Sequence, residues 1–246
     1  MKKIAFGLLC VLGFASFAFG NFEANFKKSI RDLTNIDVEI QVKKELKSFN
    51  GEYFVIGRTK GGDIFPVIVS KDGKHFIGLS SVMNFSKEDS KMITEEINKA
   101  GAAKMQADKQ ALGKLFASFK ESDFVMLQGE GKDLPTKIVV SDPDCPYCRK
   151  HLENVESELK EANLKFIFAP VHDENAFIKA QLILNQSVKA KDNARKIAIL
   201  RKYYTDIKLS EKEKKTDIKQ VKFTTEKIFG SGLVSGVPFI FEIDNE

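Results

Sequence analysis

Residues 138–151 have the sequence IVVSDPDCPYCRKH, and this stretch decides the fold. Residues 137–140 (KIVV), apolar after Lys137, are typical of a short strand, and a helix is expected from Pro146, because proline suits the first helical position. Cys145 then stands at the helix N-terminus, where unpaired backbone N–H groups and the helix dipole stabilise a thiolate. The thiolate is the attacking species in disulfide exchange, and Cys148 follows about one turn later. The stretch therefore predicts a strand, a reactive loop and a helix that carry a redox-active C-x-x-C pair.

Two other uses of this cysteine pair have less support. A structural zinc site needs two more ligands, yet there is no second cysteine pair and the histidines, His75, His151 and His172, are scattered. A purely structural disulfide across so small a loop would stabilise the fold little, because closure entropy grows with loop length. We expect His151 to be a surface helix residue, with a modest role in stabilising a thiolate as the alternative. The sequence has no phosphate-binding loop, and we expect neither a metal nor another cofactor.

The first twenty residues, MKKIAFGLLCVLGFASFAFG, are typical of a secretory signal peptide. Two lysines precede an apolar run, which ends in a small-residue cleavage site formed by Ala18 and Gly20. A membrane anchor is the alternative, although a spanning helix usually needs about 20 apolar residues. Cleavage would also remove Cys10, so an exported chain keeps Cys145 and Cys148 as its only thiols. An exported protein with a single C-x-x-C pair points to redox chemistry.

Composition and charge exclude several classes of protein. The chain has 246 residues, 43% of them hydrophobic, with 39 Lys and Arg against 34 Asp and Glu and a formal charge of +5. This apolar content excludes a disordered chain, and three cysteines are too few for a disulfide-stapled mini-protein. The charge is mild and mixed along the chain, so it gives no support to a nucleic-acid partner.

Residues 21–85 are predicted to form a helix followed by a small antiparallel sheet. Residues 22–34 place apolar side chains at helical spacing, and the segment that follows alternates apolar and polar residues from Ile36 to Val42. Further strands are expected at residues 53–56, 64–69 and 76–79, separated by the hairpin signals Gly61-Gly62 and Asp72-Gly73. Because so short a unit folds alone only marginally, we expect it to pair with a second copy.

Residues 86–122 are predicted to form a linker helix. Ser86 and Asp89 resemble a capping box, and an apolar stripe that includes Met105 follows at helical spacing. We interpret this stripe as ordinary core packing. The functional alternative is a rigid spacer between two domains.

Residues 123–246 are predicted to form the second domain, with an α/β order of elements. After the cysteine helix, the segment from Leu164 to Val171 alternates like a strand, residues 174–229 are mostly helical, and residues 239–243 form a last strand.

The segment GLVSGVPF at residues 232–239 ends at this last strand. Pro238 cannot donate a hydrogen bond to a sheet, so it must stand at a strand start or on an edge. An ordinary turn would explain it. A cis Val237–Pro238 bond would instead leave the Val237 backbone free to pair with an extended substrate, whose cysteine would then reach Cys145.

Three segments together resemble the thioredoxin-fold DsbC/DsbG group of periplasmic disulfide isomerases: DPDCPYC, the later LVSGVPFIF, and KDGKHFI at residues 71–77. The resemblance implies a cystatin-like N-terminal dimerisation domain, a linker helix and a catalytic thioredoxin fold with a helical insertion. It also implies a V-shaped periplasmic homodimer whose active sites face a shared cleft.

By the same resemblance, Cys145 is the nucleophile and Cys148 the resolving thiol. Pro146, Tyr147, Val237 and Pro238 form the substrate-binding surface, with Val237-Pro238 as the cis-proline loop. The expected partners are exported cysteine-containing client proteins and a membrane redox partner that recycles the thiols.

Two features depart from the family pattern. The isomerases usually carry Thr before the cis-proline, whereas Val237 is more typical of DsbA-type oxidases. The sequence also stops just after the last strand, without the edge strand and terminal helix of a thioredoxin fold, so we expect it to be truncated at the C terminus. Two alternatives to an isomerase or reductase stay open: a DsbA-like oxidase that donates disulfides, and a dimeric chaperone that holds unfolded clients.

Overall fold

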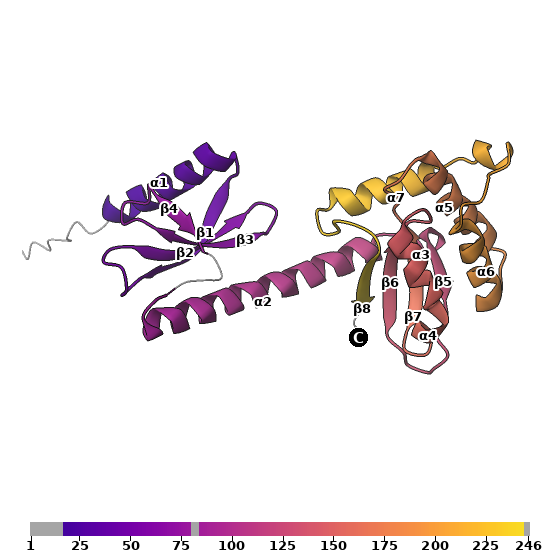
Figure 1. The fold of residues 1–246 in the computed structure, drawn as a ribbon, viewed down its shortest axis with the longest axis horizontal. Coiled ribbons are helices and arrows are strands. Elements are labelled where there is room, and N and C mark those ends of the chain that lie inside the picture. The colour runs from indigo at the N-terminus through magenta and orange to yellow at the C-terminus, as the bar shows by residue number, and fades with distance from the viewer. Residues whose placement is uncertain (1–16, 80–83, 244–246) are drawn as a thin grey trace, which may run out of the picture. The chain divides into compact units, whose positions relative to one another are not determined.

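A computed structural model describes residues 17–79 and 84–243 (Figure 1). Most of the predicted signal peptide, residues 1–20, and the last residues, 244–246, lie outside this part. The chain divides into two compact units, and the boundary along the chain falls between Ala107 and Asp108. No helix in the described part is both long and apolar enough to cross a membrane.

The N-terminal unit is built on a sheet in which every strand is antiparallel to its neighbour in sequence, in the order β1-β2-β3-β4. The elements before and within the sheet are α1 (Phe17–Thr34), β1 (Val38–Glu45), β2 (Tyr53–Thr59), β3 (Ile64–Val69) and β4 (Phe76–Gly78). The predicted hairpin turns are present, and Gly62 and Gly73 have positive φ angles, which suit glycine. The predicted helix-plus-sheet fold of this unit is confirmed.

Each face of this sheet is covered by a helix. The apolar side of α1, with Phe22, Phe26 and Ile30, packs on Val55 and Val67 of one face. The other face carries Phe54 and Ile56, which pack against the N-terminal half of α2 (Lys87–Ala117). Alternate residues of β2 thus point to opposite faces, as the pleat requires.

The long helix α2 starts with half of the predicted capping box. The Ser86 hydroxyl accepts a hydrogen bond from the Asp89 backbone N–H at 3.1 Å. The Asp89 carboxylate turns to the sheet unit instead and accepts from the backbone N–H groups of Lys47, at 3.1 Å, and Ser48, at 2.6 Å. This buried carboxylate fixes the start of the helix to the loop after β1.

The apolar stripe of α2 is core only near the helix ends. Ile93 is buried in the N-terminal unit, and Leu112 and Phe116 are buried in the C-terminal unit. Met105, between them, is 71% exposed, so our interpretation of the stripe as core packing is wrong there. Gly101 and Gly113 lie within α2 and do not interrupt the helix.

The C-terminal unit contains a mixed sheet of order β5-β7-β6-β8, in which only the β6–β7 pair is parallel. Its strands are β5 (Phe124–Leu127), β6 (Thr136–Ser141), β7 (Asn163–Phe168) and β8 (Phe239–Ile243). The sequence analysis missed β5, and β7 ends before Val171, which is exposed. The α/β class predicted for this unit is confirmed.

Helices cover both faces of this sheet. They are α3 (Pro146–Glu153), α4 (Val155–Glu158), α5 (Glu174–Ser187), α6 (Asn193–Tyr203) and α7 (Lys219–Gly230), with short 3₁₀ turns at Glu121–Asp123 and Glu213–Lys215. Val139 of β6 faces the core that includes α3, α5 and α6, whereas Ile138 and Val140 face the end of α2 and Ile228 of α7. The central strand β6, buried on both faces, leads directly into the cysteine motif.

Candidate active site

The cysteine motif begins where β6 ends. The chain turns after Ser141, and Cys145 takes an extended conformation (φ −75°, ψ 121°) as the N-cap of α3, with Pro146 at the first helical position. The carbonyl oxygen of Cys145 accepts from the Arg149 backbone N–H at 3.0 Å, which starts the helix. The sulfur therefore lies beside the unpaired N–H end of α3, a position that favours an anion.

The Cys145 sulfur faces the loop before β8. Its Sγ atom lies 3.6 Å from the carbonyl oxygen of Val237. The Val237–Pro238 peptide bond is cis, as the resemblance implies. Tyr147, the second of the two residues between the cysteines, is 74% exposed. The structure thus brings Cys145, Tyr147, Val237 and Pro238 into one region, although their roles stay predictions.

Cys148 lies inside the first turn of α3 and is completely buried. Burial raises the pKa of its thiol to about 12, partly offset by hydrogen bonds from the Ser141 hydroxyl and the Asp142 backbone N–H to its sulfur. Cys145 and Cys148 are both free thiols here. Both residues are buried, but Cys145 is 5% exposed and Cys148 is not exposed at all, so we call Cys145 the outer cysteine and Cys148 the inner one.

Asp142, the first residue after β6, has a fully buried side chain held by three partners. Its carboxylate accepts from the backbone N–H groups of Asp144 and Val171, both at 2.8 Å, and lies 2.6 Å from Nδ1 of His172. Such contacts satisfy a buried carboxylate and fix the loop that leads to Cys145.

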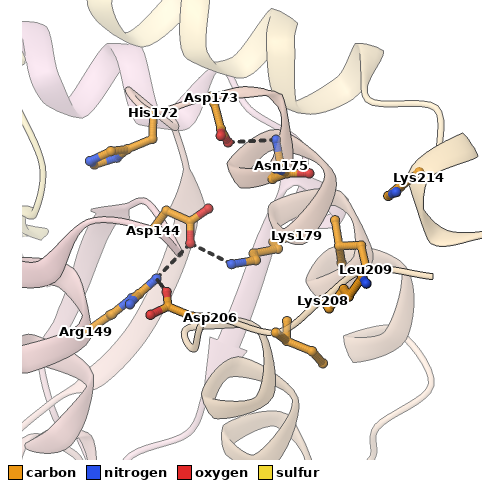
Figure 2. Close-up of a pocket in the computed structure, with 11 residues that line it drawn as sticks. Asp144, Arg149, His172, Asp173, Asn175, Lys179, Asp206, Lys208, Leu209 and Lys214 are labelled. Atoms are coloured by element: carbon orange, nitrogen blue, oxygen red, sulfur yellow. Dashed lines mark hydrogen bonds and ion pairs between the residues drawn. The ribbon is translucent and has the colours of Figure 1, made fainter. Parts of the chain in front are cut away.

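Asp144 directly precedes Cys145 and is paired with two cations (Figure 2). Its Oδ1 atom lies 2.7 Å from Nζ of Lys179 on α5 and 2.8 Å from a guanidinium nitrogen of Arg149 on α3. The same guanidinium reaches Asp206 at 2.8 Å. Both carboxylates near Cys145, those of Asp142 and Asp144, therefore have hydrogen-bond or ion-pair partners.

His151 is not the surface residue that the sequence analysis expected. Its side chain is only 10% exposed and packs edge-on against the Phe166 ring at 6.1 Å between centroids. Its Nε2 atom lies 3.1 Å from Glu158 Oε1, though without hydrogen-bond geometry. Because Phe166 belongs to β7, this contact shows that the side of α3 that carries His151 faces the sheet.

No group of metal-ligating side chains occurs among the residues that the structure describes. The expected absence of a metal or other cofactor stays a prediction.

The comparisons with known proteins agree with this geometry. Residues 26–112 match the family model described as the N-terminal part of the disulfide isomerase DsbG. The solved structure of Helicobacter pylori DsbG is 29% identical, covers 89% of this chain and 100% of its own, and has a TM-score of 0.54. By these two matches the chain is similar to the DsbC/DsbG group of thiol:disulfide interchange proteins.

More distant solved structures also match. Alpha-DsbA2 from Wolbachia pipientis is 15% identical over 58% of this chain and 88% of its own, with a TM-score of 0.42. The catalytic domain of Proteus mirabilis ScsC is 19% identical over 55% of this chain and 85% of its own, with a TM-score of 0.33. A comparison with curated proteins found no match.

The chain is thus a thiol-disulfide oxidoreductase. The sequence analysis missed the side chains that surround its cysteines from the helical insertion. Lys179 and Tyr204 come from segments 30 to 60 residues beyond the motif, and both are buried near it. No local sequence pattern marks either residue, because both reach the cysteines only through tertiary packing.

Proposed function

We propose that this oxidoreductase reshuffles or reduces incorrect disulfides in exported proteins, with Cys145 as nucleophile and Cys148 as resolving thiol. The observation that carries the proposal is the Cys145 sulfur, 3.6 Å from the Val237 carbonyl oxygen beside the cis-proline bond. A client strand that pairs with the Val237 backbone would bring its own sulfur to Cys145.

The chemistry proceeds in two exchanges. The Cys145 thiolate attacks a client disulfide, so a Cys145–client S–S bond forms and one client sulfur leaves as a thiolate. In isomerisation, another client thiolate attacks the client sulfur of this mixed disulfide and regenerates Cys145, with no net oxidation. In reduction, Cys148 attacks Cys145, the second client sulfur leaves and takes the Cys148 proton, and the two electrons pass from the cysteine pair to the client.

Client binding would use the exposed surface around Cys145. Pro146 and Tyr147 form one side of this surface, and Val237 and Pro238 form the other. Tyr147 is 74% exposed, so its ring is available for contact with an unfolded client. An apolar ring beside the nucleophile favours extended segments of unfolded chains over folded surfaces.

The N-terminal unit favours isomerase or reductase over oxidase, because its family model is that of the disulfide isomerase DsbG. We propose residues 21–85 as a domain that joins two copies, residues 86–122 as the linker helix and residues 123–246 as the catalytic domain. The protein would act in the periplasm, after removal of residues 1–20, and a membrane redox partner would keep its cysteines reduced.

Trapping of client adducts tests the roles of the two cysteines. Cys148→Ala is expected to accumulate covalent, thiol-reducible adducts with client proteins, because the first exchange proceeds and the second cannot. Cys145→Ala, the matched control, is expected to form none. Adducts on Cys145→Ala, or their absence from Cys148→Ala, would show that the assignment is wrong.

The direction of the reaction is tested by the resting redox state in cells. Acid quenching followed by thiol alkylation reports how much of the Cys145–Cys148 pair is reduced. A reduced pair supports isomerase or reductase activity. An oxidised pair would identify a disulfide donor, and Val237 would then be the more informative feature.

A further inference from the structure

A buried chain of polar side chains leads from the helical insertion to Cys148. Tyr204, the C-cap of α6, is 4% exposed, and its hydroxyl lies 2.6 Å from Oγ of Ser141, the last residue of β6. The Ser141 hydroxyl also acts on the Cys148 sulfur and lowers the pKa of that thiol, against the effect of burial. Ser141 and Cys148 are both fully buried, so water does not compete for these contacts.

Tyr204 stays protonated in this chain and does not act as a base. Burial raises the pKa of its phenol well above the ordinary value, and the nearby Cys148, Asp142 and Cys145 raise it further, although the Ser141 hydrogen bond lowers it. The phenol therefore keeps its proton throughout the reaction. When it donates to Ser141 Oγ, the Ser141 proton is free to point toward the Cys148 sulfur, so both hydroxyl groups are aligned with a developing thiolate.

We propose that Tyr204 is a positioning residue for the resolving step: through Ser141 it stabilises the Cys148 thiolate as that sulfur attacks Cys145. This inference rests on the proposed roles of the two cysteines and adds a residue to the second exchange alone. The first exchange does not involve it, because the Cys145 sulfur faces Val237 instead.

The two exchanges can be separated with the disulfide reagent 5,5′-dithiobis(2-nitrobenzoate), used at one equivalent on the reduced full chain. Cys145 attacks the reagent disulfide, forms a mixed disulfide and releases one coloured aryl thiolate. Cys148 then attacks Cys145 Sγ and forms the intramolecular disulfide. The second aryl thiolate leaves, and the Cys148 proton passes to water. The two releases report the two steps as successive absorbance phases.

Tyr204→Phe is expected to leave the first phase unchanged and to slow the second about tenfold, since hydrogen bonds that act on charged groups are among the stronger ones. Ser141→Ala removes the direct donor and is expected to slow the second phase at least as much. The matched control is Tyr203→Phe, in which the neighbouring buried tyrosine loses a hydroxyl that bonds Gln186 and Glu213 instead. Tyr203→Phe is expected to leave both phases unchanged.

A selective effect on the second phase distinguishes positioning from a general structural role. An unchanged second phase in Tyr204→Phe would overturn the inference while the proposed function stands. Equal slowing of both phases, or a second phase slowed as much by Tyr203→Phe, would also overturn it. If the unmodified protein gave no first phase, the nucleophile assignment would fail and this inference with it.

Discussion

Cys145 and Cys148 are three residues apart on one short helix, yet their sulfur atoms have different surroundings. The Cys145 sulfur lies at the helix N-terminus against the cis-proline loop, and charged groups lie close behind it. The Cys148 sulfur is completely buried and is approached by a hydroxyl and a backbone N–H. One cysteine therefore has an ionic environment and the other a neutral one.

This difference in surroundings supports the proposed order in which the two cysteines react. On the Cys145 side, Asp144 would disfavour a thiolate, but Lys179 and Arg149 balance its charge. On the Cys148 side no charge compensates burial, so that thiol stays protonated until the first exchange has brought a reactive sulfur next to it. This contrast supports the proposed order, in which Cys145 reacts before Cys148.

The largest expected difference between the two cysteines is the difference in their alkylation rates. A pKa of about 12 leaves only about one in 10⁵ Cys148 thiols ionised at pH 7, against a few per cent for an ordinary free thiol. We expect iodoacetamide at pH 7 to modify Cys145 at least about a thousandfold faster than Cys148. Fragmentation mass spectrometry of the reduced, quenched protein locates the label on either cysteine.

The pH dependence of the slow reaction serves as an internal control. Between pH 7 and 10 the Cys148 thiolate population rises tenfold per unit, so its alkylation rate in Cys145→Ala is expected to rise about tenfold per pH unit. Comparable alkylation rates for the two cysteines at pH 7 would show that the two sulfur atoms do not differ in reactivity as expected.

The next effect concerns the charges behind Cys145. Lys179 is 4% exposed and is paired with a carboxylate that is itself mostly buried. Lys179→Met keeps the length of the side chain but leaves Asp144 with Arg149 alone. We expect the free energy of unfolding, measured by urea denaturation, to fall by about 3 kcal/mol.

Lys214→Met is the matched control for this change. Lys214 lines the pocket that Asp144 and Lys179 also line (Figure 2). Its ion pair with Glu211 is exposed, so the loss of this pair is expected to change stability by less than about 0.5 kcal/mol. Adding Asp144→Asn to Lys179→Met should recover part of the lost stability, since the unpaired charge disappears. Equal effects of the two lysine substitutions would mean that the buried pair has no special role.

These residues also show how far sequence reasoning reaches. The cysteine motif, the cis-proline segment and the hairpins of the N-terminal sheet depend on neighbours a few residues away, so local patterns predicted them. β5 is only four residues long and pairs with β7 some 40 residues later, which leaves little periodicity to recognise.

The side chains from the helical insertion were out of reach for a different reason. Residues 174–229 were expected to be helical, and the structure has α5, α6 and α7 there. The periodicity of a helix gives its apolar face, but not which strand end that face will cover. Lys179 and Tyr204 are therefore ordinary positions in the sequence and become part of the site only through tertiary packing.

The smallest effect is a pH dependence of stability that only the inner cysteine should produce. In the unfolded chain a cysteine loses its proton near pH 9.0, whereas folded Cys148 holds it up to about pH 12. Between these values the unfolded state binds fewer protons, so stability falls as pH rises, by about 1.4 kcal/mol per unit. Below pH 9 this contribution is fully present.

The measurement is the difference in urea stability between the reduced protein and Cys148→Ala at pH 8, 9, 10 and 10.5. Subtraction removes the titration of lysines and tyrosines, which both proteins share. We expect the difference to be constant up to pH 9 and then to shift against the reduced parent protein. The oxidised protein has no Cys148 thiol and should follow the variant. Parallel curves of stability against pH over the whole range would mean that the Cys148 sulfur is solvated. The distinction between the two cysteines would then rest only on the exposure of Tyr147 and on the cis-proline loop.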